Sequence, residues 1–395
     1  MRVSLEAALA LTVARGQACQ VGIETVPVQE AAGRVLREDV VFPNELPPFS
    51  YAQMDGYALC TQEGPGSRLR VEGESRAGRP EFSTTRAAIA ISTGAMTPPQ
   101  THAVVPWEHV ERVQDTITLK QPVQPGQFIR RAGDDARAGD PVASSGTRLE
   151  LTHIPALAVA ERASVAVARR PTVALFLTGD ELRAPGAPDT LGSIVDTNGP
   201  MLVALLRSVG AHIVGVHHVA DIEGALEPLL LDCTADVLIT VGGAAEGNHD
   251  HVASALAHIG AAWVFRGVAI KPGKPVGLAE RGASTLIALP GNPGSALVTA
   301  MLFVLPLLAA MEGEDAAGPH FTPAIASTPL ACADDRIVIH YGAVRGVDGL
   351  ARFQAAKGAA SGSVAGLLTA QSLAFVPIGA AVPAGGVVPT LRIAR

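Results

Sequence analysis

The middle of the sequence alternates between short apolar runs of strand length and segments whose apolar residues have helical spacing. Strands that alternate with helices form βαβ units, whose strands lie parallel in one sheet. We therefore predict a central, mostly parallel α/β domain over residues 171–318. Its predicted strands are Val173–Leu177, Ile213–His217, Val237–Val241 and Leu286–Leu289.

Two helices of this region can be predicted individually. One follows Asn198, its predicted N-cap, and is stopped by Gly210, because Leu202, Leu205, Leu206 and Val209 repeat at helical spacing between them. The other, Ala296–Met311, is the most apolar segment of the chain. It is shorter than the roughly 20 residues that a membrane span needs, and it contains Pro306. We expect a buried core helix and no membrane association.

The flanking regions have different patterns, so we expect a multidomain protein that combines α/β and β domains. Residues 1–45 read as a helix and an extended piece, and a helical pattern over Leu149–Val167 predicts a discontinuous domain of residues 1–45 and 146–170. A proline-rich segment, Pro43–Pro48, marks a boundary. Short β runs predict a β-rich domain over 46–145 and a C-terminal β domain over 319–395. The runs in the β-rich domain are Ala88–Ile91, Ala103–Val105, Thr116–Leu119 and Pro141–Ala143.

Length, charge and cysteine usage narrow the class of protein. A chain of 395 residues exceeds one ordinary core, so two to four domains are expected. The formal net charge of −7 does not favour nucleic acid as a partner. The four cysteines are scattered and form no CxxC pair, which fits a reducing cytoplasm and offers neither a zinc site nor a disulfide framework.

Glycines and carboxylates follow the predicted central strands. In an open parallel sheet, ligands bind beyond the carboxyl ends of the strands, which meet at one edge. We therefore expect a site at this edge. The residues there are Thr178, Gly179, Asp180 and Glu181 after the first strand, Asp221 after the second, Gly242, Gly243, Gly247 and Asp250 after the third, and Pro290, Gly291, Asn292 and Ser295 after the last.

Each of these elements also has a simpler structural interpretation. The glycines would let backbone N–H groups approach a phosphate, or they would only form tight strand-to-helix turns. Ser295 would bind an anion at a helix start, or it would only cap the helix. Glu181 and Asp250 would hold Mg²⁺ together with phosphate oxygens, or they would be solvated loop residues.

The lysines are concentrated in one loop. The sequence holds only four lysines among 30 basic residues, and two of them flank the Pro272-Gly273 pair as Lys271 and Lys274. Compact ammonium groups suit phosphate or another tetrahedral oxyanion, and the alternative is a plain surface turn.

Several common sites lack their fingerprints. The sequence has no GxxxxGK[ST] loop and no GxGxxG after a strand, so triphosphatase and NAD-binding functions are not indicated. His249 and His251 flank Asp250, but no third ligand cluster at suitable spacing supports zinc.

Taken in order along nearly the whole chain, six motifs resemble those of the MoeA/gephyrin-E family of molybdopterin molybdenumtransferases. The motifs are Pro48-Phe49 with Met54-Asp55-Gly56-Tyr57-Ala58; Thr93-Gly94-Ala95 with Ala103-Val104-Val105 and Glu108; Arg131-Ala132-Gly133-Asp134-Asp135 with Gly139; Thr178-Gly179-Asp180-Glu181-Leu182 with Asp196-Thr197-Asn198; Lys271-Pro272-Gly273-Lys274-Pro275; and Leu289-Pro290-Gly291-Asn292-Pro293-Gly294-Ser295-Ala296.

This resemblance implies a four-domain, elongated homodimer. Its central MogA-like domain binds the pterin, and the β-rich domain of the partner subunit completes the cleft. The implied reaction takes adenylylated molybdopterin and molybdate, with Mg²⁺, to molybdenum cofactor and AMP in the cytoplasm. A molybdopterin adenylyltransferase and acceptor molybdoenzymes would be its partners.

The resemblance also implies roles for particular residues. Carboxylates would bind Mg²⁺ or orient the phosphate linkage, with Glu181 and Asp250 as metal ligands, and lysines and serines would hold oxyanions. The implied catalytic residues are Asp55, Asp135, Glu181, Asp221, Asp250, Lys271 and Lys274. Ser361 in a Ser-Gly pair would join Ser295 and the strand-end residues in substrate binding.

Departures from the family pattern keep two alternatives open. Ala244, Ala245 and Glu246 replace the middle of the third glycine loop, which removes a serine hydroxyl and adds a negative charge. Ala359 stands where the family has glutamine before Ser361. A non-catalytic paralogue that binds pterin or a partner protein is one alternative. A molybdopterin adenylyltransferase is the other, although the extra β domains and the lysine loop argue against it.

Overall fold

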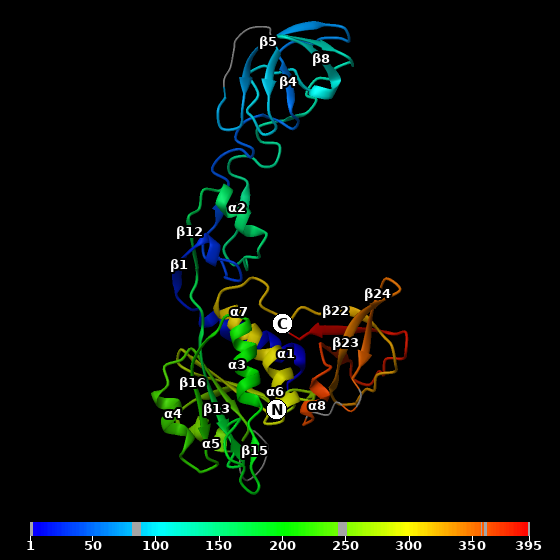
Figure 1. Cartoon of the computed structure of the whole chain (residues 1–395). Coiled ribbons are helices and arrows are strands. Elements are labelled where there is room, and N and C mark those ends of the chain that lie inside the picture. The colour runs from blue at the N-terminus through cyan, green and yellow to red at the C-terminus, as the bar shows by residue number, and fades with distance from the viewer. Residues whose placement is uncertain (1–2, 81–87, 244–250, 357, 359–361, 394–395) are drawn as a thin grey trace. The chain divides into compact units, whose positions relative to one another are not determined.

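The computed structural model of the chain describes residues 3–80, 88–243, 251–356, 358 and 362–393. The chain divides into two compact units (Figure 1). The first, here the α/β unit, comprises Met1–Arg37, Ser145–Leu151 and Val165–Arg395. The second, here the β-rich unit, comprises Glu38–Ser144 and Thr152–Ser164. The predicted division into four domains stays a prediction.

A six-stranded sheet forms the core of the α/β unit. Four parallel strands lie side by side, and two antiparallel strands extend the sheet at one edge. The predicted mostly parallel sheet is confirmed, because its central strands are apolar runs that are buried on both faces. In sheet order the strands are β16 (His212–Val219), β13 (Thr172–Thr178), β17 (Val237–Val241), β21 (Ser284–Leu289), β20 (Gly277–Arg281) and β18 (Ala262–Arg266).

Helices cover both faces of this sheet (Figure 1). Adjacent residues of β13 point to opposite faces, so Leu175 and Phe176 belong to different buried clusters. The cluster of Leu175 includes residues of α3 (Asn198–Ser208), α6 (Pro293–Thr299), α7 (Leu305–Met311) and α1 (Leu5–Ala18). The cluster of Phe176 includes residues of α4 (Leu226–Asp232) and α5 (His251–His258). Helix α3 begins at Asn198 itself, with Thr197 as its N-cap, one residue earlier than predicted.

The predicted core helix near residue 300 is confirmed, with a local difference. Residues 293–311 pass the length and hydropathy criteria for a membrane span, but 89% of that window is buried inside the fold, as in a core helix. The helix is continuous in direction but contains a π-helical turn, η3 (Ala300–Val304), between α6 and α7. Pro306 lacks the N–H that an α-helix would use there, which accounts for the wider turn.

Helix α1 packs closely against α7. Ser4 caps α1, since its hydroxyl accepts the Ala7 N–H at 3.1 Å. On the face of α1 toward α7, a Cβ added to Gly16 would lie 2.5 Å from the Cβ of Ala310 and 2.7 Å from the carbonyl oxygen of Leu307. The two helices can approach this closely only because residue 16 is glycine.

The predicted helix over Leu149–Val167 is wrong for most of its length. Only α2 (His153–Val159) is helical there, and Ser164–Ala168 forms strand β12, which pairs with β1 (Ile23–Pro27). Val165 and Val167 are buried while Ser164 is exposed, so the period is two. The backbone pairing of β12 with β1 therefore determines the structure of these residues, although their sequence weakly favours a helix. A 3₁₀ turn, η1 (Val28–Glu30), follows β1.

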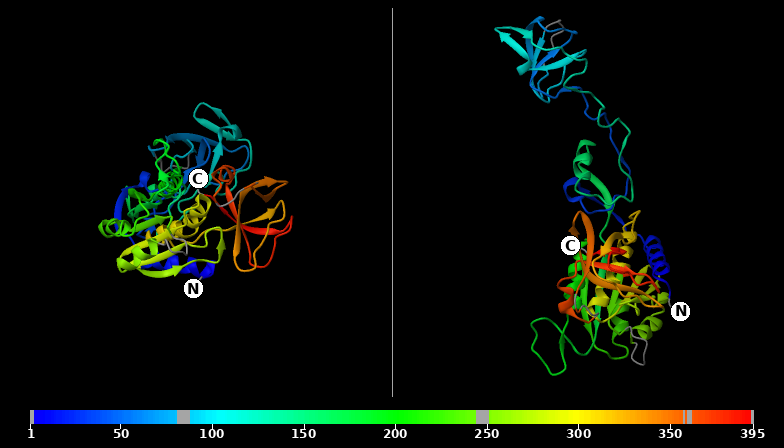
Figure 2. Two further views of the ribbon diagram at one scale, coloured as in Figure 1. Left: turned by 90° about the horizontal axis from the view of Figure 1, so that it is seen from below. Right: turned by 90° about the vertical axis from the view of Figure 1, so that its right-hand side faces the viewer.

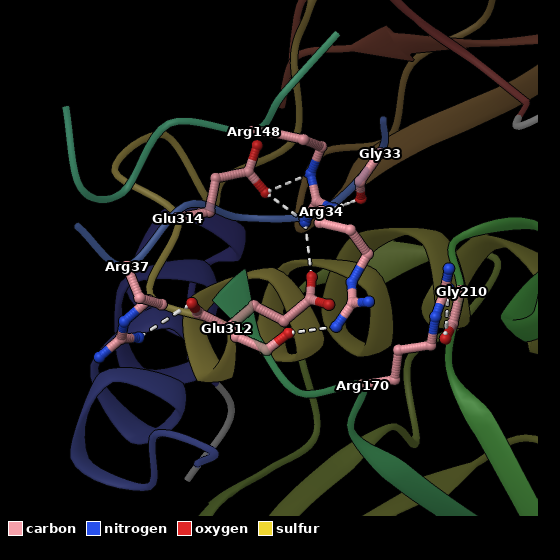
Figure 3. A network of polar contacts seen from close by, with 9 residues as sticks. Gly33, Arg34, Arg37, Arg148, Arg170, Gly210, Glu312 and Glu314 are labelled. Atoms are coloured by element: carbon pink, nitrogen blue, oxygen red, sulfur yellow. Dashed lines mark hydrogen bonds and ion pairs between the residues drawn. The ribbon is translucent and has the colours of Figure 1, made fainter. Parts of the chain in front are cut away.

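A network of ion pairs lies at the end of α7, all within the α/β unit (Figure 3). Arg148 contacts Glu312 and Glu314, each at 2.7 Å, and donates to the carbonyl of Gly33 at 2.8 Å. Burial raises the pKa of Glu312 although Arg148 opposes this shift. The network ties the segment 145–151 to Gly33 and to the residues just after α7.

The C-terminal strands form a second sheet beside the α/β core (Figures 1 and 2). Because β23 pairs with both β24 and β25, the five C-terminal strands close into a ring, which confirms the predicted C-terminal β region. Strand β19 (Ile270–Lys271) joins this ring by pairing in parallel with β23. The ring comprises β23 (Ile337–Val347), β24 (Leu350–Ala355), β22 (Thr322–Ala326), β26 (Val387–Arg392) and β25 (Ser372–Val376); the unit also contains α8 (Val364–Leu367), β14 (Leu182–Arg183) and β15 (Ile194–Val195).

The β-rich unit is built on another six-stranded sheet. The predicted runs in this part of the chain are all strands, since each is a short segment with buried apolar residues between turns. The sheet order is β7 (Ala103–Pro106), β4 (Gly56–Leu59), β6 (Ala88–Ile91), β5 (Arg68–Ser75), β9 (Thr116–Leu119) and β8 (Val110–Val113). The remaining elements are β2 (Val40–Val41), β3 (Tyr51–Ala52), β10 (Ile129–Arg130), β11 (Pro141–Ala143), η2 (Trp107–His109) and α2.

Replacing Asp236 with asparagine should destabilise the α/β unit. Its carboxylate binds the Arg169 guanidinium at 2.7 and 2.8 Å and accepts the Thr172 N–H at 2.7 Å. Burial alone would raise the pKa of Asp236, but these hydrogen bonds outweigh it and hold the pKa below its usual value. We expect the free energy of unfolding at pH 7 to fall by about 1–3 kcal/mol.

Chemical denaturation at several pH values checks this prediction. Since the folded-state pKa is lowered, the contribution of Asp236 is fully present above its unfolded pKa of about 3.9 and is lost as the pH falls through the folded value. The difference between wild type and variant should therefore shrink below pH 4. The exposed Asp232, replaced in the same way, is the control. Equal effects of the two replacements would contradict the assigned role.

Candidate functional site

A cavity of about 550 Å³ lies at the carboxyl ends of the parallel strands, where the sequence predicts a site. We call it the strand-end cavity. Its wall combines the ends of three central strands with the start of α6 and with Gly362 and Val364 near α8. Five of the predicted site residues line it: Thr178, Glu181, Gly242, Gly291 and Asn292.

The glycines at this edge allow close packing of the strand ends. Gly242 has a φ of +93°, and a Cβ there would lie 2.7 Å from the carbonyl oxygen of Thr178. A Cβ on Gly291 would lie 3.4 Å from the Cα of Gly242. Gly242 thus forms a tight turn, its phosphate-binding role stays a prediction, and Thr178 and Gly291 close the same corner of the cavity.

Three predicted carboxylates gather beside the cavity. Asp180 accepts the backbone N–H of Asp221 at 3.0 Å, and Glu181 follows directly in the chain. Burial, together with the negative charges of Asp180 and Glu181, raises the pKa of Asp221, while His251 opposes this shift. The structure thus brings the acids after β13 and β16 together, and their mutual repulsion favours a cation nearby.

These carboxylates fit Mg²⁺ only in combination with a phosphate-bearing ligand. Within the described ranges, no group of three or more His, Cys, Asp or Glu side chains is placed to hold a metal by itself. Magnesium commonly uses one or two carboxylates, substrate phosphates and water, so a site with Glu181 and one further carboxylate suits it. The predicted ligand Asp250 and the predicted substrate residue Gly247 lie outside the described residues.

Two buried polar residues in the same wall were not predicted as site residues. Asp196 accepts the Gly199 N–H at 2.9 Å and contacts the His218 ring at 3.1 Å, and so fixes the start of α3. Asn198 donates to the carbonyl of Gly291 at 2.7 Å. Both belong to the Asp-Thr-Asn motif that carried part of the resemblance, which was the available signal for them.

A second cavity, of about 480 Å³, surrounds the lysine loop. We call it the lysine cavity. Lys271, Lys274 and Ser295 line it, so the structure brings together the three residues expected to hold oxyanions. Gly273 between the lysines has a φ of +109°, and a Cβ there would lie 2.7 Å from Thr299 Cγ2 of α6, so the loop is fitted closely to that helix.

The C-terminal ring supplies the other wall of the lysine cavity. Because β19 pairs in parallel with β23, the lysine loop lies beside Arg336 and Tyr341, which also line the cavity. Neither residue was predicted as a site residue. No local pattern marks them, since this pairing joins segments that are far apart in the sequence.

The two cavities adjoin the same short segment at the start of α6. Asn292 and Pro293 line the strand-end cavity, while Ser295 lines the lysine cavity. A ligand with an anionic end could therefore span from one cavity toward the other past Pro293 and Ser295. The predicted residue Pro290 lies in the same loop and is buried, and Gly179 and Gly243 lie in the turns after β13 and β17.

The remaining predicted site residues lie elsewhere. In the β-rich unit, Asp55 accepts the N–H of Thr93 at 2.7 Å and its hydroxyl at 3.1 Å, and Asp135 forms an ion pair with Arg130. Each belongs to a local network within that unit. Ser361 lies outside the described residues, next to Gly362 of the strand-end cavity.

Two family models match separate parts of the chain. One, described as "MoeA N-terminal region (domain I and II)", matches residues 3–160. The other, described as "Probable molybdopterin binding domain", matches residues 174–310, which include the central parallel strands and α6.

Individual proteins are similar over most of the chain. A molybdopterin molybdenumtransferase of Haemophilus influenzae is 37% identical over 322 residues, which cover 80% of this chain and 79% of the relative. One from a Nostoc species is 33% identical over 372 residues, 90% of this chain and 85% of the relative. A solved molybdopterin biosynthesis MoeA protein from Pyrococcus horikoshii has a TM-score of 0.82 at 28% identity, covering 99% of this chain and all of that one.

Proposed function

Because this chain belongs to the MoeA family of molybdopterin molybdenumtransferases and is thus an enzyme of molybdenum cofactor biosynthesis, we propose that it inserts molybdate into adenylylated molybdopterin and releases AMP. The observation that supports this proposal is that the two cavities adjoin the same segment at the start of α6. One cavity has the volume and the polar groups that an organic ligand with phosphates needs, and the other has cationic groups for an oxyanion.

The strand-end cavity would hold the adenylylated pterin. Its volume of about 550 Å³ falls in the range of small-molecule sites. Polar groups from four chain segments converge there, and Asn292 with the N-terminal end of α6 offers N–H donors to a phosphate.

The carboxylates beside this cavity would bind Mg²⁺ once phosphate is present. Glu181 would be a direct ligand, with Asp250 as the second ligand that the family resemblance implies. Bound there, Mg²⁺ would neutralise phosphate charge while the phosphate linkage breaks. Asp180 and Asp221 would orient the site through the bond between the Asp180 carboxylate and the Asp221 N–H.

The lysine cavity would hold molybdate. Lys271 and Lys274 supply two positive charges on a loop shaped by Pro272 and Gly273, which offset the repulsion between two anionic reactants. Since Ser295 lines this cavity two residues after Pro293 of the strand-end cavity, molybdate bound there would lie on the way to the pterin ligand. Preorganised charge of this kind is an effective contribution to catalysis.

Measuring AMP release from adenylylated molybdopterin tests the proposed function. Wild-type protein should release AMP only when both molybdate and Mg²⁺ are present. Formation of adenylylated molybdopterin from ATP would instead support the adenylyltransferase alternative. Binding of the pterin without turnover would support the non-catalytic alternative, which the substitutions Ala244, Ala245 and Glu246 suggest.

Assembly and location are further parts of the proposal. The protein would be a cytoplasmic homodimer in which the partner's β-rich unit completes each site, bringing in Asp55 and Asp135. A molybdopterin adenylyltransferase would supply its substrate, and acceptor molybdoenzymes would receive its product.

Light scattering at micromolar concentration should therefore give about twice the chain mass of 40.5 kDa. A single species at the monomer mass would contradict the shared site.

A further inference from the structure

Tyr341 lies in the wall of the lysine cavity with its hydroxyl withdrawn from solvent. The residue belongs to β23 of the C-terminal ring and is only 4% exposed. Within the described part of the chain, its hydroxyl has no hydrogen-bond partner. Lys271, Lys274 and Ser295 line the same cavity.

An unpartnered buried hydroxyl is costly. Leaving such a group without a hydrogen bond destabilises the folded protein, and phenylalanine would fill nearly the same space without that penalty. The other deeply buried tyrosine is different, because Tyr57 is 3% exposed and its hydroxyl contacts the Arg112 guanidinium at 3.3 Å. The polar group of Tyr341 therefore lacks a partner among the described residues, and a ligand in the cavity is the candidate for that role.

The surroundings of Tyr341 indicate an anionic partner. Burial raises the pKa of Tyr341, so the hydroxyl stays protonated and can donate. Among the described residues that line the cavity there is no carboxylate. Arg336 at the rim is already paired with Asp335, and the His340 ring contacts the carbonyl of Ala331 at 2.9 Å. Lys271 and Lys274 thus add positive charge to a lining without carboxylates.

We propose that the Tyr341 hydroxyl donates a hydrogen bond to a tetrahedral oxyanion bound in the lysine cavity, beside Lys271 and Lys274. This inference rests on the proposed function of that cavity and adds to it a binding residue from the C-terminal ring. The oxyanion is either free molybdate or the phosphate of the nucleotide part of the substrate. Both offer the same acceptor oxygens, so the test must separate them.

Calorimetric titration of wild type and Tyr341→Phe with molybdate and, separately, with AMP tests the inference. A hydrogen bond to a charged group contributes about 1.5–3 kcal/mol, so the Kd of the bound anion should rise about tenfold or more. The melting temperature of Tyr341→Phe without ligand should equal or exceed that of the wild type, because the unpartnered hydroxyl is gone. Tyr57→Phe is the matched control: it should leave both affinities unchanged and should not raise the melting temperature.

Each result of this titration has a definite meaning. Weaker molybdate binding alone assigns the hydroxyl to the free oxyanion, and weaker AMP binding alone assigns it to the phosphate. Unchanged affinity for both anions, or a lower melting temperature with unchanged affinity, would overturn the inference. Lys271→Ala in the same titration separates this failure from a failure of the proposed function. If molybdate binding weakens in Lys271→Ala but not in Tyr341→Phe, the proposed function is supported and only the role of Tyr341 is contradicted.

Discussion

Replacing Glu181 with alanine should lower turnover by about a hundredfold or more, a loss of the size seen when a group that stabilises charge in the transition state is removed. The melting temperature should remain near that of the wild type. Glu181 is exposed at the wall of the strand-end cavity, and replacements at exposed positions usually change stability by about 0.5 kcal/mol or less. Single-turnover AMP release and thermal unfolding together check this prediction.

The control for Glu181 is Glu223→Ala, which removes an exposed carboxylate from the loop after β16 and should leave turnover unchanged. Equal losses in the two variants would show a general electrostatic effect instead of a specific role. If activity and melting temperature fall together in Glu181→Ala, the role of Glu181 is structural.

Asp55 requires a different comparison. Its carboxylate accepts two hydrogen bonds from Thr93, so alanine there should lower both turnover and the melting temperature. Asparagine keeps an acceptor oxygen and should preserve the fold while it still lowers turnover. Full activity in Asp55→Asn would exclude a role for the negative charge.

Replacing Lys271 or Lys274 with alanine should raise the molybdate concentration at half-maximal insertion about tenfold or more, because each removes a charge-assisted hydrogen bond of about 1.5–3 kcal/mol. The fold should survive, since both lysines lie at the wall of the lysine cavity and not in the apolar core. Lys274→Arg should also be impaired, because a wide planar guanidinium replaces a compact ammonium.

Titrating molybdate in the insertion assay checks these variants, with Lys120→Ala in the β-rich unit as the control. If both alanine variants reach half-maximal insertion at the same molybdate concentration as the wild type, the lysines do not bind the oxyanion. The loop would then be only a structural turn. If Lys274→Arg alone matches the wild type, charge and not ammonium geometry determines binding.

The central sheet could be predicted from sequence because its strands are buried on both faces. A strand such as Val237–Val241 is a continuous apolar run, and its observed bounds equal the predicted ones. Strand β12 was missed because the alternation of polar and apolar residues over Ser164–Ala168 is short. It also follows closely after helix α2. Its pairing with β1 depends on tertiary contacts that local propensity does not contain.

The site could be predicted in part for a related reason. Topology alone places the residues after parallel strands at one edge, so Thr178, Glu181 and Gly242 were found. Tyr341 was missed because it reaches the lysine loop only through the pairing of β19 with β23. Before that pairing is known, a tyrosine in a strand is simply an apolar core residue.

The close packing of α1 on α7 affects how the chain is made on the ribosome. Gly16 leaves the exit tunnel long before its neighbour Ala310, which is synthesised only after the β-rich unit and the central sheet. At about 5–20 residues per second, α1 waits tens of seconds for the helix that covers it. During that time its apolar face is open to chaperones and to other nascent chains. Slower translation between α1 and α7 lengthens this wait and should therefore lower the yield of soluble protein.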